Sequence, residues 1–590
     1  MPEPIEDYAV IGDRRTAALV SLRGSVDWLC LPRFDSPACF AALLGGPEHG
    51  RWLLAPADDA AVPERRYRDG TSVLETTWRT ASGEVTVTDL MPAGDDRADL
   101  VRTVTGVRGT VRMRHEWVVR PSYGSVVPWV THQRDEDGHD VVRAVAGPDQ
   151  FVLHGPRLPR PHDLRHTDEF DVEEGDTLAW STVWTHSWRP VPGPAALEDV
   201  VAASCAEEAR WSSFAPDDVP HRDAVARSLV TLRLLTHSET GGIVAAPTTS
   251  LPEDFGGERN WDYRFCWLRD AALTLEALLT AGYEEESRAW RLWLLRAVAG
   301  DPRDLQIMYA VDGGRDLPER VLDHLPGYAD SSPVRIGNGA VDQRQSDVLG
   351  EVMIALEQAR EAGVHETEDS WAVQRALVDQ LAETWQEPDH GLWEIRGPLR
   401  HFTHSRVMVW AAFDRAVRAV ERHGLPGPVD KWRAIRDDVR DEVMERGWDE
   451  ERRTFTQHYE TDEVDASLLT LGLVGFLPGD DPRVLGTIAA VEEDLMRDGL
   501  LLRYRTETGV DGLAGDEHPF LACSFWLVSA YAAAGRLDDA HALLDRLCSL
   551  TNDVGLMAEE YDVEGGRMAG NFPQAFSHLG LVTAAFALRR

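Results

Sequence analysis

The sequence is short of basic residues, above all of lysine. Its 590 residues hold 60 Lys and Arg against 100 Asp and Glu, a formal net charge of −40. Lys431 is the only lysine, so nearly every cation is an arginine. A GC-rich coding bias explains the arginine, and salt adaptation is the alternative explanation of the acidity. Because this charge repels phosphate backbones and anionic lipid surfaces, we expect neither a nucleic-acid partner nor a membrane partner.

Cysteine pairs and long apolar runs are also missing. The six cysteines are spread over the chain without a Cys-x-x-Cys pair, which argues against a zinc ribbon, a redox motif and a disulfide scaffold. We expect buried free thiols instead. No run of 18 uninterrupted apolar residues occurs, and the segment from Met1 to Tyr8 has neither the basic nor the apolar region of a signal peptide. These absences predict a cytoplasmic protein.

Two kinds of hydrophobic periodicity divide the chain. Up to about residue 200 the period is two: in residues 111–118 apolar side chains and His115 alternate with Arg112, Arg114 and Glu116. Short strands at such spacing, separated by turn signals such as Asp69-Gly70, predict an antiparallel β-sandwich. The length is also too great for one ordinary domain. We therefore expect an N-terminal β-sandwich domain with its linker over residues 1–210.

Beyond about residue 225 the period becomes that of a helix. Apolar stripes occur at Leu349, Val352, Met353 and Leu356; at Trp410, Phe413, Val417 and Val420; and at Leu537, Ala540, Leu544 and Leu547. Glycines such as Gly424 follow several of these segments and are typical of helix ends. The region has room for about a dozen helices, at roughly 30 residues each with their connections. A dozen helices can close into a double ring, so residues 211–590 form the second expected domain, after a linker near residues 190–208.

Three loops between these helices are dense in aromatic and charged residues. They are residues 260–270, 391–397 and 555–562, the last followed by 570–574. Aromatic faces cover the apolar faces of a sugar ring, while carboxylates and guanidinium groups bind its hydroxyls. Taken singly, a Trp-Glu pair is more often core packing, and Arg269-Asp270 could equally be an ion pair at a helix start. Their coincidence on three loops favours a sugar site, where two carboxylates would flank a glycosidic bond.

These motifs carry a resemblance to a known family. The stretches are residues 4–8 and 24–37 near the N-terminus, and 261–270, 333–347, 520–527 and 570–578 further on. In their order and in the strand-then-helix layout the chain resembles glycoside hydrolase family 15, which includes glucoamylases, glucodextranases and the bacterial and archaeal trehalases of that family. The resemblance implies an α+β multidomain fold with an N-terminal antiparallel β-sandwich followed by an (α/α)6 helical barrel.

The resemblance also assigns roles to residues of the three loops. It implies that Glu394 is the general acid and that Glu559 is the general base. It implies that a sugar is bound by Tyr263, Trp267, Arg269 and Asp270. Trp393 would form the wall of this pocket next to Glu394. Glu560 would either hydrogen-bond a second glucose or be a solvated neighbour of the base, and either Arg503 or Arg505 could line the same pocket. No organic cofactor and no metal is implied.

The sequence departs from the starch-degrading branch at three places. Ile395 follows the acid where many glucoamylases have a second Glu, and the base loop contains Ala558-Glu559-Glu560 in place of Pro-Glu-Gln. The tryptophan below their next sugar has no counterpart near residues 334–338. These departures are more similar to the trehalases. We therefore expect an inverting, exo-acting α-glucoside hydrolase that splits α,α-trehalose into two glucose molecules.

Three alternative functions remain open, and one further motif is weaker. A glucoamylase-like exo-glucosidase would act on maltose, isomaltose or short maltodextrins. A phosphorylase would need phosphate and no water-activating base, and a non-catalytic protein would bind sugar without turnover. His401 and His404 have a spacing seen in metal sites, although such an isolated pair is more often structural. The expected partner is a small-molecule glucoside, and self-association into a homo-oligomer is left open.

Overall fold

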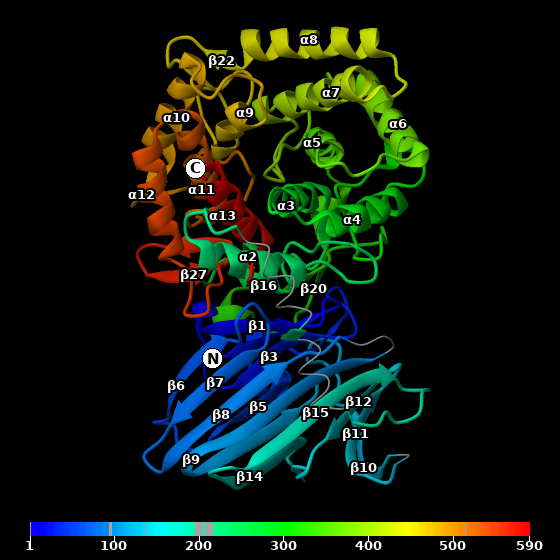
Figure 1. Cartoon of the computed structure of the whole chain (residues 1–590), viewed down its shortest axis with the longest axis vertical. Helices are drawn as coiled ribbons and strands as arrows, with labels where there is room; N and C mark the ends of the chain where they lie inside the picture. Colours follow the sequence, from blue (N-terminus) through cyan, green and yellow to red (C-terminus); the bar gives the residue numbers. More distant parts are fainter. Residues whose placement is uncertain are drawn as a thin grey trace.

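A computed structural model describes residues 2–93, 97–135, 137–194, 205–206, 216–513 and 515–589. Figure 1 shows a strand domain at one end of the molecule and a helical domain at the other. The last strand of the first domain ends at His186 and the first helix of the second begins at Arg222. The predicted domain boundary at residues 210 and 211, and most of the predicted linker, lie outside the described residues.

The N-terminal domain is built around one long strand, β9 (Ala98–Val118). The other strands are β1 (Tyr8–Gly12), β2 (Ala17–Ser21), β3 (Ser25–Cys30), β4 (Ala38–Phe40), β5 (Arg51–Pro56), β6 (Val62–Tyr67), β7 (Leu74–Arg79), β8 (Gly83–Leu90), β10 (Trp129–Arg134), β11 (Asp140–Ala146), β12 (Asp149–His154), β13 (Arg160–His162), β14 (Arg165–Glu173) and β15 (Thr177–His186). The first half of β9 pairs with β8 and β15, and its second half pairs with β5 and β14, all antiparallel. Because the two halves of β9 pair with different strands, β9 belongs to both layers of a sandwich.

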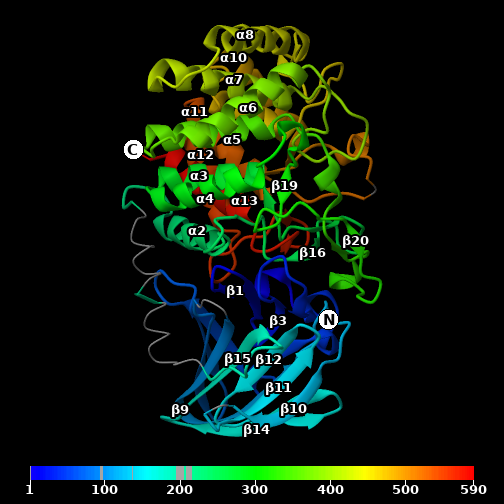
Figure 2. The same cartoon turned by 90° about the vertical axis from the view of Figure 1, so that its right-hand side faces the viewer.

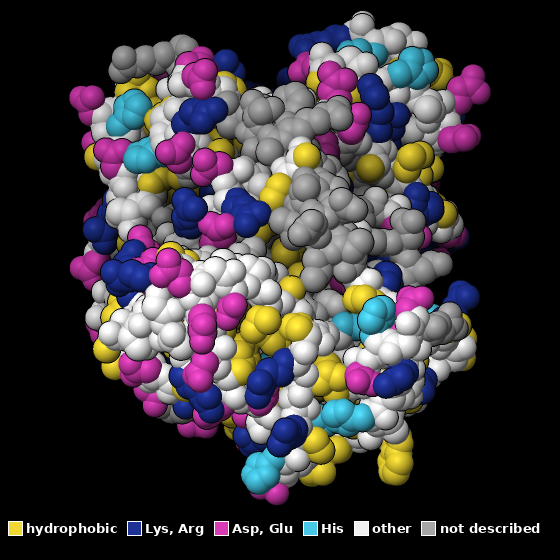
Figure 3. All heavy atoms as spheres, turned by 60° about the horizontal axis from the view of Figure 1, so that its bottom comes forward, with side chains coloured by type: hydrophobic (Ala, Val, Ile, Leu, Met, Phe, Trp, Pro, Cys, Tyr) yellow, Lys and Arg dark blue, Asp and Glu magenta, His cyan; other side chains and the backbone are white. Residues whose placement is uncertain are grey.

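The predicted alternation along β9 is present, except that Glu116 is buried as well and pairs with Arg51 at 2.8 Å. Val111, Met113, His115 and Trp117 are buried, whereas Arg112 between them is exposed. Successive side chains of a strand point to opposite faces, so one face of β9 meets the core of the sandwich. His115 is accommodated there because its Nε2 accepts a hydrogen bond of 2.9 Å from the indole of Trp52. On the face shown in Figure 3, acidic and basic side chains are interspersed.

The C-terminal domain contains twelve α-helices within the described residues. They are α2 (Arg222–Leu234), α3 (Leu268–Thr280), α4 (Glu284–Ala297), α5 (Val348–Glu361), α6 (Glu368–Thr384), α7 (Thr403–His423), α8 (Val429–Arg446), α9 (Thr470–Leu473), α10 (Pro482–Leu495), α11 (Leu521–Ala533), α12 (Leu537–Cys548) and α13 (Ala575–Ala587). Helices α3, α5, α7, α9, α11 and α13 contact one another in a closed ring, and the other six lie outside it. This is the (α/α)6 barrel that the resemblance implies.

The two rings differ in the way they are buried. The inner helix α11 is buried along almost its whole length, because neighbours surround it on all sides. The outer helix α8 buries only Trp432, Val439 and Val443 and exposes its charged face.

None of the described helices is both long and apolar enough to cross a membrane. All six cysteines are free thiols, four of them buried, whereas Cys205 and Cys548 are partly exposed.

Each of the three predicted loops leads into the N-terminus of an inner helix. Residues 260–267 precede α3, residues 391–397 precede α7, and residues 555–574 precede α13. Consecutive inner helices of the ring run in the same direction, so the loops meet at one end of the barrel. Helix α3 begins at Leu268, which places Arg269 and Asp270 in its first turn.

The sandwich supports one of these loops directly. Figure 2 shows β1 and β3 lying below the barrel segment β16 (Thr249–Pro252). Arg264 is buried at this contact, where it pairs with Asp262 at 2.7 Å. Its guanidinium also donates to the main-chain oxygen of Ser36 at 2.8 Å and to the hydroxyl of Tyr123 at 2.9 Å. The loop that carries Tyr263 is therefore held from the side of the sandwich.

Candidate active site

The three loops meet around one pocket with an empty volume of about 400 Å³. Its walls are formed by Ala245, Tyr263, Trp267, Arg269, Asp270, Leu392, Trp393, Glu394, Arg503, Phe520, Glu559, Gln574 and Phe576. Seven of the eight site residues expected from the sequence are among them, and Glu560 is not. The pocket combines carboxylates, guanidinium groups and aromatic rings, which are the groups that a sugar site requires.

Glu394 projects into the pocket from a tight turn. Its φ angle is +57°, a left-handed conformation that is strained for a residue with a side chain and that is concentrated at functional sites. The side chain of Gln343 holds the turn by donating a hydrogen bond of 2.9 Å to the main-chain oxygen of Glu394. The Glu394 side chain is 22% exposed, and its Oε1 lies 3.6 Å from Nη2 of Arg269. The carboxyl is thus accessible from the pocket and fixed in direction.

The surroundings of Glu394 suit a proton donor. Burial and the charge of Asp270 raise the pKa of Glu394 above its usual value of 4.5, although Arg269 opposes this. Trp393 forms the wall beside it, and its indole donates a hydrogen bond of 3.1 Å to Asp465. A carboxyl with a raised pKa retains its proton closer to neutral pH, as a general acid must.

Glu559 lies deeper, directly before β26 (Glu560–Asp562). Only 1% of the residue is exposed, and its Oε1 accepts a hydrogen bond of 2.8 Å from the hydroxyl of Tyr263. Its Oε2 is buried and has no hydrogen-bond partner among the described residues. Gly570, at φ +78°, packs against this carboxylate, and a Cβ there would lie 2.6 Å from Oε2. Glycine at position 570 therefore leaves the space that the carboxylate occupies.

The electrostatic surroundings of Glu559 act in both directions. Burial and the charge of Glu253 raise the pKa of Glu559 well above its usual value. Arg503, the Tyr263 hydroxyl and the backbone N–H of Asn571 lower it by stabilising the carboxylate. A general base must be ionised, so these three groups are the ones that make the role available to a carboxyl at this depth.

Arg269 connects the first loop with the loop of the acid. Its Nε donates to Oδ2 of Asp270 at 2.9 Å and its Nη1 donates to the main-chain oxygen of Leu392 at 2.7 Å. The predicted helix-start ion pair is therefore present, and both partners also line the pocket. Tyr263 and Trp267 meet edge to face, with ring centroids 5.5 Å apart, and complete this side of the wall.

The structure places Glu560 away from the pocket. Adjacent residues of an extended segment point to opposite sides, so Glu560 is directed away from Glu559. Its Oε2 accepts a hydrogen bond of 3.1 Å from the backbone N–H of His518 and the side chain is fully buried. It is therefore neither a wall of the pocket nor a solvated neighbour of the base. Of the two arginines left open, Arg503 lines the pocket, whereas Arg505 pairs with Glu463.

Gln574, Phe520 and Phe576 line the pocket without having been singled out from the sequence. Gln574 precedes α13 and is buried, and its Oε1 has no hydrogen-bond partner within the described part of the chain. It can therefore accept a hydrogen bond from a sugar hydroxyl. Its loop was recognised in the sequence, but an amide has no acid or base chemistry to mark it.

Within the described residues, the two histidines with metal-like spacing have surroundings unlike those of metal ligands. His404 is buried, and burial together with Arg269 lowers its pKa to about 3. His401 stacks on Tyr459 with ring centroids 5.9 Å apart. Neither belongs to a group of three metal-ligating side chains; the described residues contain one such group, in the sandwich domain, and it consists of Asp135, Asp137 and His139.

An (α/α)6 barrel that holds two carboxyls in one aromatic-walled pocket at its loop end belongs to the class of glycoside hydrolases. Comparison with known proteins specifies the family. The model of the glycosyl hydrolases family 15 matches residues 219–586, and the model of a trehalase-like N-terminal domain matches residues 1–159. The chain belongs to glycosyl hydrolases family 15.

Individual relatives agree with this assignment. The chain is 38% identical to a trehalase of Mycolicibacterium smegmatis, in an alignment that covers 98% of this chain and 90% of that one. It is 33% identical to a trehalase of Thermoplasma volcanium over 98% and 93% of the two chains. A bacterial glucoamylase solved in complex with acarbose superposes with a TM-score of 0.68, over 100% of this chain and 94% of that one, at 11% identity. The last similarity shows the fold.

Proposed function

We propose that this glycoside hydrolase splits α,α-trehalose into two glucose molecules with inversion at one anomeric carbon. Glu394 acts as the general acid and Glu559 as the general base. The observation that carries the proposal is that one pocket holds both carboxyls in different surroundings. Glu394 is partly exposed beside an aromatic wall, whereas Glu559 is buried and one of its oxygens has no hydrogen-bond partner among the described residues.

The proposed reaction needs one proton on the pair. Glu394 donates its proton to the glycosidic oxygen as the bond from that oxygen to the anomeric carbon breaks. Glu559 accepts a proton from a water molecule, whose oxygen attacks the same carbon from the opposite face. An inverting pair needs a separation of about 6.5–9.5 Å to admit that water. The donated and accepted protons balance, and the new hydroxyl has the β configuration.

The walls of the pocket support a glucoside substrate, because they combine aromatic rings with carboxylate and guanidinium groups. Ile395, which stands where glucoamylases have a second Glu, is buried and is not a wall of the pocket. Arg503 and Gln574 are the polar walls left to bind the second glucose. The likeness to two trehalases over nearly the whole chain favours trehalose over the maltose-type alternative.

Proton NMR of the purified protein tests the proposal. The protein is given trehalose and, separately, maltose, and the anomers are followed before mutarotation mixes them. We expect trehalose to disappear and β-glucose to appear in excess of its equilibrium share. Cleavage of maltose alone would keep the mechanism and change the substrate to that of a glucoamylase. Glucose 1-phosphate formed only with added phosphate would replace hydrolysis by phosphorolysis, and no change in either sugar would contradict the proposal.

A further inference from the structure

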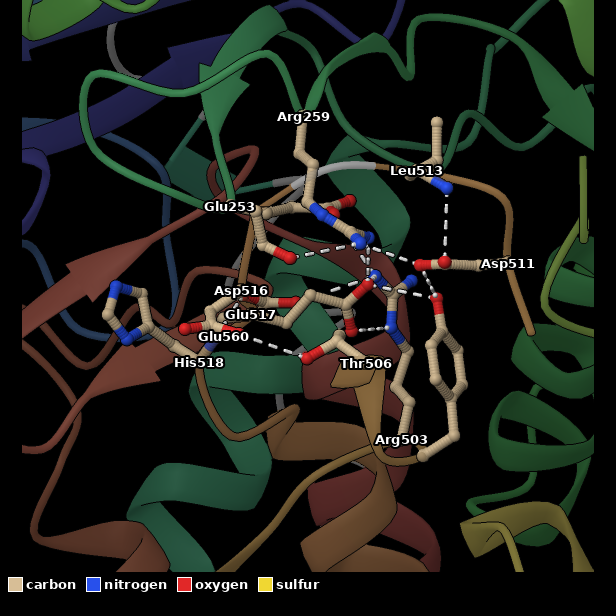
Figure 4. Close-up of polar contacts among 12 residues, drawn as sticks. Glu253, Arg259, Arg503, Thr506, Asp511, Leu513, Asp516, Glu517, His518 and Glu560 are labelled. Atoms are coloured by element: carbon tan, nitrogen blue, oxygen red, sulfur yellow. Dashed lines mark hydrogen bonds and ion pairs between the residues drawn. The ribbon is translucent and has the colours of Figure 1, made fainter. Parts of the chain in front are cut away.

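A buried network of charged side chains lies behind the base. We call it the carboxylate network; its members are Glu253, Arg259, Arg503, Tyr504, Asp511, Glu517 and Glu560. Figure 4 shows the two guanidinium groups and the carboxylates converging from separate segments of the chain. Of these members only Arg503 lines the pocket. The reaction proposed above uses none of the four acids.

Glu517 is the centre of the carboxylate network, and its side chain is 1% exposed. Its Oε2 accepts a hydrogen bond of 2.9 Å from Nε of Arg503, and its Oε1 lies 2.6 Å from Nη2 of the same residue. The same Oε1 accepts from Arg259 at 2.5 Å and from the hydroxyl of Tyr504 at 2.9 Å. One carboxylate therefore fixes two guanidinium groups, and its two oxygens bind Arg503 in a fork geometry that determines the plane of that guanidinium.

One end of the network reaches the base. Nη2 of Arg503 donates to Glu253 at 3.0 Å and lies 3.7 Å from Glu560, the residue next to the base. Nη1 of Arg503 has no hydrogen-bond partner among the described residues, and the guanidinium lies against the ring of Phe520, 5.1 Å from its centroid. Because its other edge is held by acids, Arg503 turns this remaining edge to the pocket.

The other end of the network reaches the loop of the acid. Nη2 of Arg259 donates to Oδ2 of Asp511 at 2.6 Å. The main-chain oxygen of Asp511 accepts a hydrogen bond of 3.1 Å from the N–H of Arg396, which lies two residues after Glu394. A continuous series of contacts therefore runs from Glu560, the residue after the base, through Arg503 and Glu517 to the turn of the acid.

We propose that Glu517 is a positioning residue for the reaction, which fixes Arg503 against the sugar and holds the turn of Glu394 at a constant distance from Glu559. The inference rests on the proposed function of the pocket. A displacement of about 1 Å at a reacting group can cost about a hundredfold in rate, so a side chain that touches no substrate can still limit turnover. Glu517 does so through Arg503 on one side and through Arg259 on the other.

The test compares Glu517→Gln with Asp511→Asn and with a matched control. Asp511→Asn leaves Glu517 in place and weakens the contacts of Asp511 with Arg259 and Tyr504, so it reports on positioning even where Glu517→Gln folds poorly. The control is Glu357→Gln, on α5, which also removes a buried carboxylate paired with an arginine, Arg360 at 2.8 Å, but outside the network. Each full-length variant is assayed with trehalose for kcat, KM and the pH dependence of kcat/KM, and its melting temperature is measured.

We expect Glu517→Gln to lower kcat about 10- to 100-fold with a smaller change in KM, and Asp511→Asn to lower it about tenfold. We also expect the acidic limb of kcat/KM of Glu517→Gln to move to lower pH. Without its partner Glu517, Arg503 stabilises the ionised form of Glu559 more strongly and lowers the pKa of that carboxyl. Glu357→Gln should change the melting temperature without changing kcat or the pH profile.

Two results would overturn the inference. One is an unchanged kcat and pH profile in both network variants. The other is a loss of activity that only follows the melting temperature and is equal in Glu357→Gln. A wild-type protein that cleaves trehalose while both network variants keep its kcat refutes the role of Glu517 alone. A wild-type protein without activity on any glucoside refutes the proposed function, and the positioning role with it.

Discussion

Two buried acids, one in each domain, lie in different surroundings. In the sandwich, Arg102 pairs with Asp89 at 2.8 Å, and its remaining N–H groups donate to the main-chain oxygens of Trp52 and Gly24. In the barrel, Asp347 is equally buried, but neither carboxylate oxygen has a hydrogen-bond partner among the described residues. Burial and the nearby charge of Asp389 raise its pKa to about 7. A satisfied pair holds the fold together, whereas an excess of acid is tolerated at the end of the barrel where chemistry takes place.

The largest expected effect is on the reaction. Glu394→Gln should reduce turnover by about a thousandfold or more, because the amide keeps the shape of the side chain but cannot donate a proton. Binding of the disaccharide should persist, since the pocket walls are unchanged. Steady-state kinetics and calorimetric binding measure the two properties. Near-wild-type turnover would remove Glu394 from the role of acid.

The paired charge of the sandwich should affect stability instead. Asp89→Asn leaves Arg102 buried without a charge partner, which we expect to cost about 3–5 kcal/mol of unfolding free energy. Turnover per folded molecule should stay at the wild-type value. Chemical denaturation followed by fluorescence, with activity normalised to the folded fraction, separates the two. A loss of turnover in the folded fraction would show that the Asp89–Arg102 pair affects the reaction as well as the stability.

Another acid of the barrel, Glu276, should show the opposite sign; its Oε2 accepts a hydrogen bond of 3.2 Å from Gln358. Burial raises the pKa of Glu276 on α3 from 4.5 to about 7. Between these values the folded state binds more protons than the unfolded state, so its contribution to stability falls as pH rises from about 4.5 to about 7. Glu276→Gln should therefore become more stable than the wild type by at most about 3 kcal/mol above pH 7. Unfolding free energies at pH 5 and pH 8 check this.

Glu285→Gln, on the exposed side of α4, is the control for that comparison. It has the same change of side chain at a position open to solvent. If the difference in unfolding free energy between Glu276→Gln and the wild type were the same at pH 5 and pH 8, the pKa of Glu276 would not be raised in the folded protein.

A smaller effect is expected at the edge of the pocket. Asp270→Ala should lower turnover by about tenfold or more and weaken binding of the first glucose, because a charged hydrogen bond to a sugar hydroxyl is lost. Kinetics with trehalose measure this, with the melting temperature as a check on folding. Unchanged kinetics would return Asp270 to the role of a helix-start partner of Arg269.

The fold was predictable where the pattern is local. The alternation in β9 and the apolar stripes of α5, α7 and α12 each depend on neighbours within a few residues, so composition and period were enough. The start of α3 at Leu268 is not marked by such a pattern, because Arg269 and Asp270 are polar and belong to a helix that is buried by tertiary contacts. Helix ends are less marked by periodicity than helix interiors.

The site was predictable to the extent that its loops carry recognisable motifs. Glu394 and Glu559, 165 positions apart, line the same pocket, as the resemblance implies. Glu560 had no such signal, since the three-residue strand β26 is too short to show which side chain faces inward. Gln574 could not be found either, because an amide has no acid or base chemistry to mark it. Glu517 could not be found because one of its partners, Arg259, lies on a segment far away in the sequence.

The sequence by itself determined the acidic charge, the two periodicities and the loops that carry the glutamates, since all of these are properties of neighbouring residues. Only the tertiary structure decided which glutamate faces the pocket, which is held by arginine and which is left without a partner. Burial and Coulomb interactions depend on distances in space. The side chains of Glu253, Tyr263 and Arg503 shift the pKa of Glu559, and only the closed barrel brings them together.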